Sequence, residues 1–136
     1  MNCKTENIVE RVKEITGGEG VPVVYDSVGK DTFYASLDCL APLGMMVSFG
    51  NASGPVPPFS LSELASRGSL FITRPTLFSY ASSRERLERM AAELFEVLEA
   101  GKVAPIISAR YPLSDVASAH ADLESRATTG SILLKP

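Results

Sequence analysis

The stretch VPVVYDSVGKDTFYASLDCLAPLGMMVSFGN, residues 21–51, decides the fold class of this chain. Residues 21–28 form an apolar, β-branched run that predicts a strand, and residues 45–50 predict a second strand. Between them, Asp31 is placed to cap a helix. That helix carries apolar side chains at helical spacing, namely Phe33, Leu37 and Leu40. A strand, a helix and a parallel strand make a right-handed crossover unit, so the sequence predicts an α/β protein.

The flanking sequence predicts more elements of the same kind. Pro42 and Gly44 are expected to end the first crossover helix, and the unbroken apolar run at 45–50 predicts a strand covered on both faces. Asn7 is expected to cap the first helix with Glu10 as its N3 partner, and two S-x-x-E patterns, Ser60 with Glu63 and Ser82 with Glu85, predict capping boxes. The apolar periodicity predicts helices over 7–16, 60–68, 82–100 and 114–125, and strands over 69–73, 103–107 and 131–135.

The chain lacks the glycine-rich phosphate turn of a nucleotide-binding sheet. No G-x-G-x-x-G follows a predicted strand, and the glycines of GGEG (17–20) come after a helix and before a strand, which is the reverse of the required order. The loop at 51–60 follows the carboxyl end of a strand, and in open α/β sheets ligands bind at that edge. We therefore expect a ligand edge without its usual phosphate cradle.

Composition excludes several classes of function. A chain of 136 residues with 45% apolar and 21% charged residues can bury a core, and its net charge of −3 with a pI near 5.2 argues against nucleic acid. No apolar run approaches the roughly 18 residues of a membrane span, and MNCKTEN does not resemble a signal peptide, so we expect a cytoplasmic protein without membrane contact. Two cysteines and one histidine are too few and too scattered to predict a metal site.

The predicted sheet looks unfinished at its edges. Three parallel strands leave outer edges without partners, and the short strands after Lys102 have no obvious neighbour within the chain. We expect either that further residues precede this segment in a larger protein, or that its edge pairs with a second copy.

Several long runs closely resemble one known family. In chain order they are VERVKEITGG, VVYDSVG, SLDCL, MVSFGN, ITRP, YPLSDVASAH and ESRATTGSILLKP. They resemble the C-terminal portion of bacterial zinc-independent NADPH:quinone oxidoreductases, a branch of the medium-chain dehydrogenase/reductase superfamily. The resemblance covers essentially the whole chain. It implies the second half of a Rossmann-like cofactor domain over 1–101, whose first βαβ unit is absent here, and a tail over 102–136 that returns to a catalytic domain.

The resemblance also implies cofactor contacts at the strand ends. It places Asp26, Ser27 and Val28 beside the adenosine end of NADPH, and Phe49, Gly50 and Asn51 along its pyrophosphate and nicotinamide side. It further places Thr73, Arg74 and Pro75 in the nicotinamide-side loop and Arg126 in the tail. No catalytic residue is expected from this segment, because the cofactor supplies the hydride chemistry.

Other interpretations of these residues stay open at the level of sequence. Phe49 can be ordinary core, Gly50-Asn51 an ordinary turn, and Arg126 a solvated surface residue. Where relatives carry an Asn-Tyr pair near the 2′-phosphate, this chain has Asn2-Cys3, which weakens the expected preference for NADPH over NADH.

The resemblance implies a function only for the whole enzyme. That function is hydride transfer from NADPH to a quinone or a related enone, and we expect the isolated chain to be inactive. A noncatalytic alternative is an assembly module that forms a homodimer through the edge strand 69–73. A third possibility is an unrelated small α/β ligand-binding domain.

Overall fold

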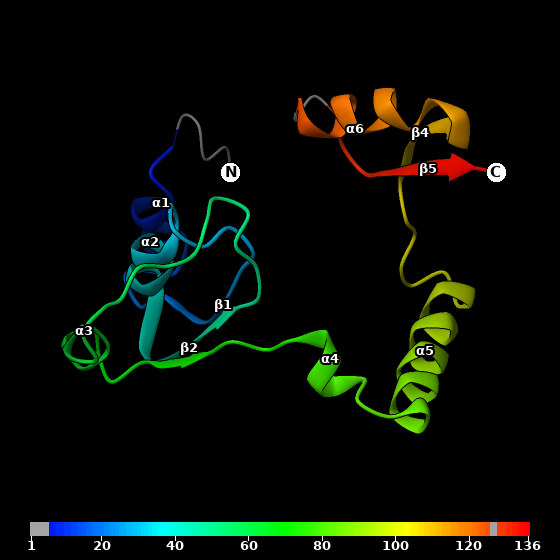
Figure 1. The fold of residues 1–136 in the computed structure, drawn as a ribbon. Coiled ribbons are helices and arrows are strands. Elements are labelled where there is room, and N and C mark those ends of the chain that lie inside the picture. Colours follow the sequence, from blue (N-terminus) through cyan, green and yellow to red (C-terminus); the bar gives the residue numbers. More distant parts are fainter. Residues whose placement is uncertain (1–5, 126–127) are drawn as a thin grey trace. The chain divides into compact units, whose positions relative to one another are not determined.

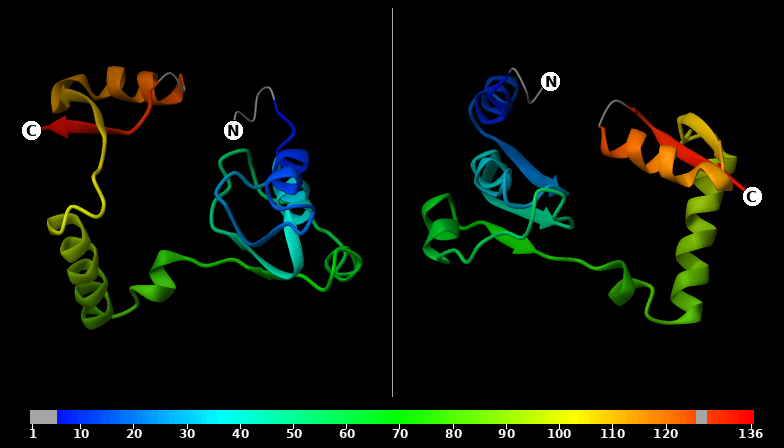
Figure 2. Two further views of the ribbon diagram at one scale, coloured as in Figure 1. Left: turned by 180° about the vertical axis from the view of Figure 1, so that it is seen from behind. Right: turned by 45° about the horizontal axis from the view of Figure 1, so that its top comes forward.

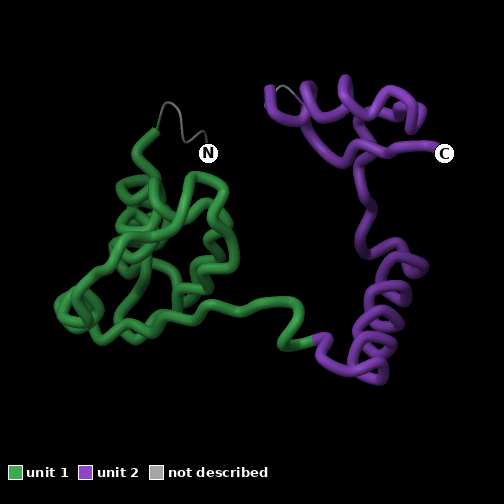
Figure 3. Tube along the Cα trace, viewed as in Figure 1, with its two compact units in different colours: residues 1–80 green, residues 81–136 purple. Residues whose placement is uncertain are grey.

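The computed structural model describes residues 6–125 and 128–136, which form two compact units. Unit 1 covers residues 1–80 and unit 2 covers residues 81–136, and the two are described separately (Figure 3). The division into a cofactor half-domain and a tail at residue 101 refers to a larger protein and stays a prediction.

Unit 1 is built on a parallel three-stranded sheet. Its strands are β1 (Val21–Asp26), β2 (Leu40–Ser48) and β3 (Phe71–Thr73), in the order β1-β2-β3 (Figure 1). Helix α2 (Phe33–Asp38) connects β1 to β2. The crossover unit predicted from residues 21–51 is therefore confirmed, and the fold is α/β.

The boundaries around α2 differ from the predicted ones. β1 ends at Asp26 instead of residue 28, because the Asp26 side chain binds the next backbone amides and turns the chain. Thr32, not Asp31, is the N-cap of α2, and no side chain caps it. Leu40 belongs to β2 instead of the helix.

Pro42 and Gly44 lie inside β2 instead of ending a helix. The pairing of β1 with β2 slips between Val21 and Val23, so residues 41–44 bulge out of the ladder. Leu43 within this bulge has a φ of 61°. An irregular strand tolerates Pro and Gly where a regular central strand does not.

The caps of the remaining helices confirm one prediction and correct two. Asn7 caps α1 (Ile8–Ile15) by accepting from the Val9 and Glu10 amides. The predicted Ser60–Glu63 box is wrong, because α3 (Ser62–Ser66) begins after Leu61 without a side-chain cap. The Ser82–Glu85 box is also displaced, since Ser83 caps α5 (Arg84–Glu99) through the Arg86 amide. The short helix α4 (Leu77–Tyr80) was not predicted.

Only one face of the unit 1 sheet is covered within the unit. The register partners Val24, Met46 and Ile72 face the core, where Met46 is fully buried. The next row, Val23, Met45 and Phe71, is 39%, 39% and 56% exposed. The prediction that both faces of the 45–50 strand are covered is therefore wrong for unit 1. The buried core consists of Phe33, Leu37, Leu40, Met46 and Leu70.

Unit 2 contains a long helix and a separate small sheet. After α5, strand β4 (Ile107–Pro112) pairs in parallel with β5 (Ser131–Lys135), and the 3₁₀ turn η1 (Leu113–Asp115) leads into α6 (Val116–Glu124). Both views of Figure 2 show α6 lying along this strand pair, and it contacts both strands. The expectation that the tail strands lack neighbours is wrong, because they pair with each other.

The apolar stripe of α5 remains largely exposed. Leu87, Leu94 and Phe95 are each at least half exposed, and no described residue of α5 is fully buried. The strand predicted at 69–73 is likewise shortened to three residues. Among the described residues, no helix is both long and apolar enough to cross a membrane.

We predict that Leu37→Ala lowers the free energy of unfolding of unit 1 by about 2–5 kcal/mol, because it leaves a cavity in the centre of a small core. Leu37 is 1% exposed. Urea denaturation followed by far-UV circular dichroism measures the change. Leu61→Ala is the matched control, since Leu61 is 76% exposed and its truncation should cost less than about 0.5 kcal/mol. Equal losses in both variants would contradict the observed position of the core.

Candidate functional site

The carboxyl ends of the three parallel strands define one edge of the unit 1 sheet. β1 ends at Asp26, β2 at Ser48 and β3 at Thr73. Because the strands are parallel, the loops that follow them, 27–32, 49–61 and 74–76, start at the same edge. This is the edge at which open α/β sheets bind ligands.

The buried carboxylate of Asp26 organises the first of these loops. Asp26 is only 4% exposed. Its Oδ1 accepts the backbone N–H groups of Val28 (2.8 Å) and Gly29 (2.9 Å), and its Oδ2 accepts the hydroxyls of Thr32 (2.7 Å) and Ser36 (2.6 Å). Four donors therefore converge on one side chain and tie the loop to α2.

These donors also set the protonation state of Asp26. Burial by itself raises the pKa of the carboxyl, but the hydrogen bonds from Ser36, Gly29, Thr32 and Val28 together outweigh it, so the pKa lies below its ordinary value of 3.8. Asp26 is consequently an anion at neutral pH, although it is almost completely buried.

Backbone hydrogen bonds join the loop after β1 to the loop after β2. The N–H groups of Phe49 and Gly50 donate to the Asp26 carbonyl (2.8 and 3.3 Å), and the Ala52 N–H donates to the Ser27 carbonyl (3.2 Å). The two loops thus continue the pairing of their strands beyond the sheet.

Ser53 strengthens this junction with its side chain and its backbone. Its N–H and its hydroxyl both donate to the Val28 carbonyl, at 2.8 and 2.9 Å. The same hydroxyl accepts the Asp31 N–H (3.0 Å). The Lys30 N–H also donates to the Gly54 carbonyl (3.1 Å), so the loops hold each other along their length.

Gly50 is required by this close approach of the two loops. A Cβ at residue 50 would lie 2.3 Å from the Ser27 carbonyl oxygen, which is well inside van der Waals contact. Gly29 has a φ of +88°, which glycine adopts without strain, and a Cβ there would lie 2.7 Å from the Gly54 carbonyl. Both glycines therefore serve contacts between the loops themselves.

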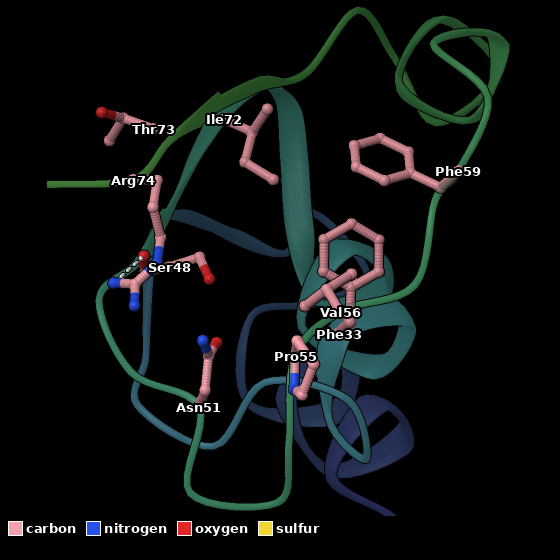
Figure 4. Close-up of a pocket in the computed structure, with 9 residues that line it drawn as sticks. All are labelled: Phe33, Ser48, Asn51, Pro55, Val56, Phe59, Ile72, Thr73 and Arg74. Carbon is pink, nitrogen blue, oxygen red and sulfur yellow. Dashed lines mark hydrogen bonds between the residues drawn. The ribbon is translucent and has the colours of Figure 1, made fainter.

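A cavity of about 380 Å³ opens beside the joined loops (Figure 4). Its size lies within the range of small-molecule pockets. It is lined by residues of β2, β3, α2 and the loops after β2 and β3, namely Phe33, Ser48, Asn51, Pro55, Val56, Phe59, Ile72, Thr73 and Arg74.

The lining of this cavity is divided into a polar and an apolar part. Figure 4 shows Asn51 and Arg74 near Ser48, where the Arg74 guanidinium donates to the Ser48 carbonyl at 3.0 Å. On the other part, the rings of Phe33 and Phe59 pack with centroids 4.8 Å apart. This arrangement suits a flat, partly apolar ring that carries hydrogen-bonding groups at one end.

A second cavity of about 270 Å³ lies among α1, β1 and α2. It is more apolar than the first and includes Val28 and Ser27 of the loop after β1. Its walls also include residues of α1 (Ile8 and Val12), of β1 (Val21 and Val24) and of α2 with its C-cap (Ala35 and Cys39). Cys39 is buried, and burial raises the pKa of its thiol, which agrees with a packing role.

The structure distributes the predicted cofactor residues over this edge. Asn51, Thr73 and Arg74 meet in the first cavity, whereas Ser27 and Val28 line the second. Phe49 is 50% exposed and is therefore not core, and Pro75 follows Arg74 in the next loop. Arg126, Asn2 and Cys3 lie outside the described residues. Whether any of these residues contacts a cofactor stays a prediction.

The sequence predicted no role for Ser53, Ser48 or the apolar wall of the first cavity. Ser53 binds Val28, which lies 25 residues earlier in the sequence, and no local sequence pattern predicts such a contact. A sequence signal for Asp26 did exist: an Asp at a strand end, followed by Gly29 three residues later, is typical of a side chain that binds its own turn.

Residues 2–134 match the family described as zinc-binding dehydrogenase. The chain belongs to this family. In the described residues of this zinc-binding dehydrogenase segment, no group of three or more His, Cys, Asp or Glu side chains is arranged to hold a metal ion.

Several relatives of this dehydrogenase segment carry the name quinone oxidoreductase. The chain is 56% identical over 138 residues to the quinone oxidoreductase of Salmonella typhimurium, a match that covers 100% of the chain and 42% of the relative. It is 54% identical over 131 residues to that of Pseudomonas aeruginosa, covering 96% of the chain and 40% of the relative. The chain thus spans about two fifths of the length of these relatives.

Solved structures give the same result. The crystal structure of Escherichia coli quinone oxidoreductase complexed with NADPH superposes with a TM-score of 0.93 at 51% identity, covering 100% of this chain and 42% of that one. These comparisons confirm the family resemblance and the Rossmann-like fold class. They exclude the alternative of an unrelated small α/β domain.

We predict that Asp26→Asn lowers stability at neutral pH, and that the difference from the unaltered chain shrinks in acid. The Asp26 pKa is lowered on folding, so its ionic contribution is complete above about pH 5 and is lost as the pH falls below about 4 toward the folded-state pKa. Urea denaturation at several pH values between 7 and 3 measures this. Asp31→Asn, the same change at an exposed residue of the same loop, should leave the acid dependence unchanged. A pH-independent difference for Asp26→Asn would contradict the prediction.

Proposed function

We propose that the protein containing this segment transfers a hydride from NADPH to a quinone or a related enone. In this proposal the segment supplies the part of the cofactor site at the carboxyl ends of β1, β2 and β3. We propose that this reaction requires no zinc, as the resemblance to zinc-independent quinone oxidoreductases implies.

One observation carries the proposal: a cavity with polar and apolar walls lies beside two strand-end loops that are fixed to each other by hydrogen bonds. A nicotinamide ring is flat, and its carboxamide both donates and accepts hydrogen bonds. Asn51 offers both kinds of group, and Arg74 offers a fixed, permanently charged set of donors. The chemistry of these residues therefore fits part of NADPH, and the match to an NADPH complex of a relative supports the assignment.

The other predicted residues are assigned to positions along the cofactor. Thr73 and Pro75 border the nicotinamide side with Arg74, while Phe49 and Gly50 precede Asn51 on the neighbouring loop. Ser27 and Val28 are assigned to the adenosine end. The cofactor contact of Arg126 that the resemblance implies stays an expectation, because Arg126 lies outside the described residues. When bound, NADPH supplies the hydride, and the segment binds and orients it.

The isolated chain is proposed to be inactive. It has no glycine-rich turn to receive the pyrophosphate, and the quinone oxidoreductases that it matches are more than twice as long. The quinone pocket is assigned to the catalytic domain of the larger protein.

We predict that a chimera of the E. coli enzyme, in which this chain replaces its matching 42%, oxidises NADPH in the presence of a quinone. The expected rate is within about tenfold of the parent, because half of the replaced residues are identical and the site residues are supplied by the new segment. Absorbance at the reduced-nicotinamide band measures the rate. In the same chimera, Asn51→Leu and Arg74→Ala should each raise the KM for NADPH.

The isolated chain provides the control. It should not consume NADPH with any quinone, and calorimetric titration with NADPH and then NADH shows whether the strand ends form a usable half-site alone. A folded chimera without activity would contradict the proposed function. Activity in the isolated chain would contradict the proposed division of the site.

A second proposal concerns assembly. Among the described strands, β3 has a partner only in β2, so its outer edge is open, and Phe71 on it is 56% exposed. Open strand edges readily pair with another chain. We propose that two copies associate through β3, either as a property of the full enzyme or as the main role of the isolated segment.

We expect sedimentation velocity of the chain to show a monomer–dimer equilibrium as concentration rises. In the dimer, the backbone amides of 71–73 that face away from β2 become slower in hydrogen exchange, because they gain acceptors. The amides of β1 (21–26), the strand at the other edge of the sheet, serve as the internal reference and should keep their exchange rates. A monomer at all concentrations, or protection that does not change at β3, would contradict pairing through this edge.

A further inference from the structure

We propose that Asp26 is a positioning residue for the dinucleotide site: its carboxylate fixes the loop after β1, and that loop in turn fixes the loop that carries Asn51. The inference rests on the proposed function, since it assumes that NADPH binds at this edge. It assigns Asp26 an indirect role, in place of the direct contact with the cofactor that its position beside the adenosine end would suggest.

Asp26 is unavailable to a ligand in this structure. It is 4% exposed, and each carboxylate oxygen already accepts two hydrogen bonds from within the chain. Its donors come from the loop, through Val28 and Gly29, and from α2, through Thr32 and Ser36. Apart from its charge, Asp26 can therefore influence a cofactor only through these partners.

The first step of that influence is the shape of residues 27–29. By holding the amides of Val28 and Gly29, the carboxylate fixes the turn in which Gly29 has a φ of +88°. In this turn the carbonyls of Ser27 and Val28 accept hydrogen bonds from the second loop.

The second step is the capture of the loop after β2. The Ser27 carbonyl accepts the Ala52 N–H, and the Val28 carbonyl accepts both the N–H and the hydroxyl of Ser53. Asn51, which lines the larger cavity, directly precedes these two residues. Asp26 is thus two hydrogen-bonded contacts away from the cavity wall.

The amides of Val28 and Gly29 require an acceptor, and the hydroxyls of Thr32 and Ser36 donate to the same carboxylate. A carboxylate accepts from two amides and two hydroxyls without donating, whereas an amide side chain replaces one acceptor oxygen by an NH₂ group. In Asp26→Asn the hydroxyls of Thr32 and Ser36 would have to rotate and accept. Asp26→Ala removes every one of these bonds, so the two variants form a graded series.

A purely electrostatic role predicts the opposite sign. NADPH is an anion, so removal of a nearby negative charge would strengthen its binding if charge alone mattered. A positioning role predicts weaker binding in both variants, with the larger loss in Asp26→Ala.

The first measurement is hydrogen exchange of the 136-residue chain. In Asp26→Asn and Asp26→Ala, the amides of Ala52 and Ser53 should exchange at least tenfold faster, although neither residue touches Asp26. The amides of Met46 and Val47 within β2 report whether the sheet remains folded. Asp31→Asn is the matched control and should leave all of these rates unchanged.

The second measurement is kinetic and uses the chimera with the E. coli enzyme. Asp26→Ala should raise the KM for NADPH at least tenfold and Asp26→Asn by a smaller factor, with kcat altered less than threefold and the KM for the quinone unchanged. Asp31→Asn should match the unaltered chimera. If Asp26→Ala does not fold, the isosteric Asp26→Asn decides alone.

Three results would overturn the proposal. Unchanged exchange at Ala52 and Ser53 would show that the loops do not depend on Asp26. Faster exchange with an unchanged KM for NADPH would show that Asp26 stabilises the loops without affecting cofactor binding. A lowered KM for NADPH would show that the charge of Asp26 matters more than its positioning of the loops. A chimera that is inactive with Asp26 in place would instead refute the proposed function itself, which separates that failure from a failure at Asp26.

Discussion

The buried carboxylate of Asp26 is the interaction on which the ligand edge depends. The turn after β1 needs acceptors for its backbone amides, because unpaired buried N–H groups are costly. Asp26 supplies them from the last position of the strand, and the hydroxyls of the α2 N-cap Thr32 and of Ser36 within α2 also donate to it. One side chain therefore sets where the strand ends, how the loop turns and how the helix is held.

The loop after β2 is fixed in turn by its hydrogen bonds to the loop after β1. Because Gly50 lacks a Cβ, the chain after β2 can lie directly against Ser27, and the backbone groups of the two loops satisfy each other. The result is a pair of joined loops beside a cavity whose walls come from β2, β3, α2 and the second loop. A site assembled in this way can hold a cofactor group in a fixed place without any catalytic side chain, which agrees with chemistry that resides in the cofactor.

One face of the unit 1 sheet is left uncovered by the residues of its own unit. Parallel sheets are normally covered on both faces, yet here Val23, Met45 and Phe71 form an exposed row on one face. The chain spans about two fifths of the quinone oxidoreductases that it matches. Two further surfaces are uncovered within their own units. The outer edge of β3 has no strand partner, and the apolar stripe of α5 is exposed.

The sequence by itself determined the α/β class, the crossover over residues 21–51, the Asn7 cap and the family, because local periodicity, capping chemistry and long matching runs are all written along the chain. Tertiary structure decided what depends on distant partners. Leu40 belongs to β2 because it pairs with Val21 of β1. Strands β4 and β5 pair although about 20 residues separate them in the sequence. Ser53 became a site residue because the Val28 carbonyl lies beside it, and Gly50 because Ser27 does. These contacts form only once the parallel strands align and bring their carboxyl ends together, so no local pattern of residues could announce them.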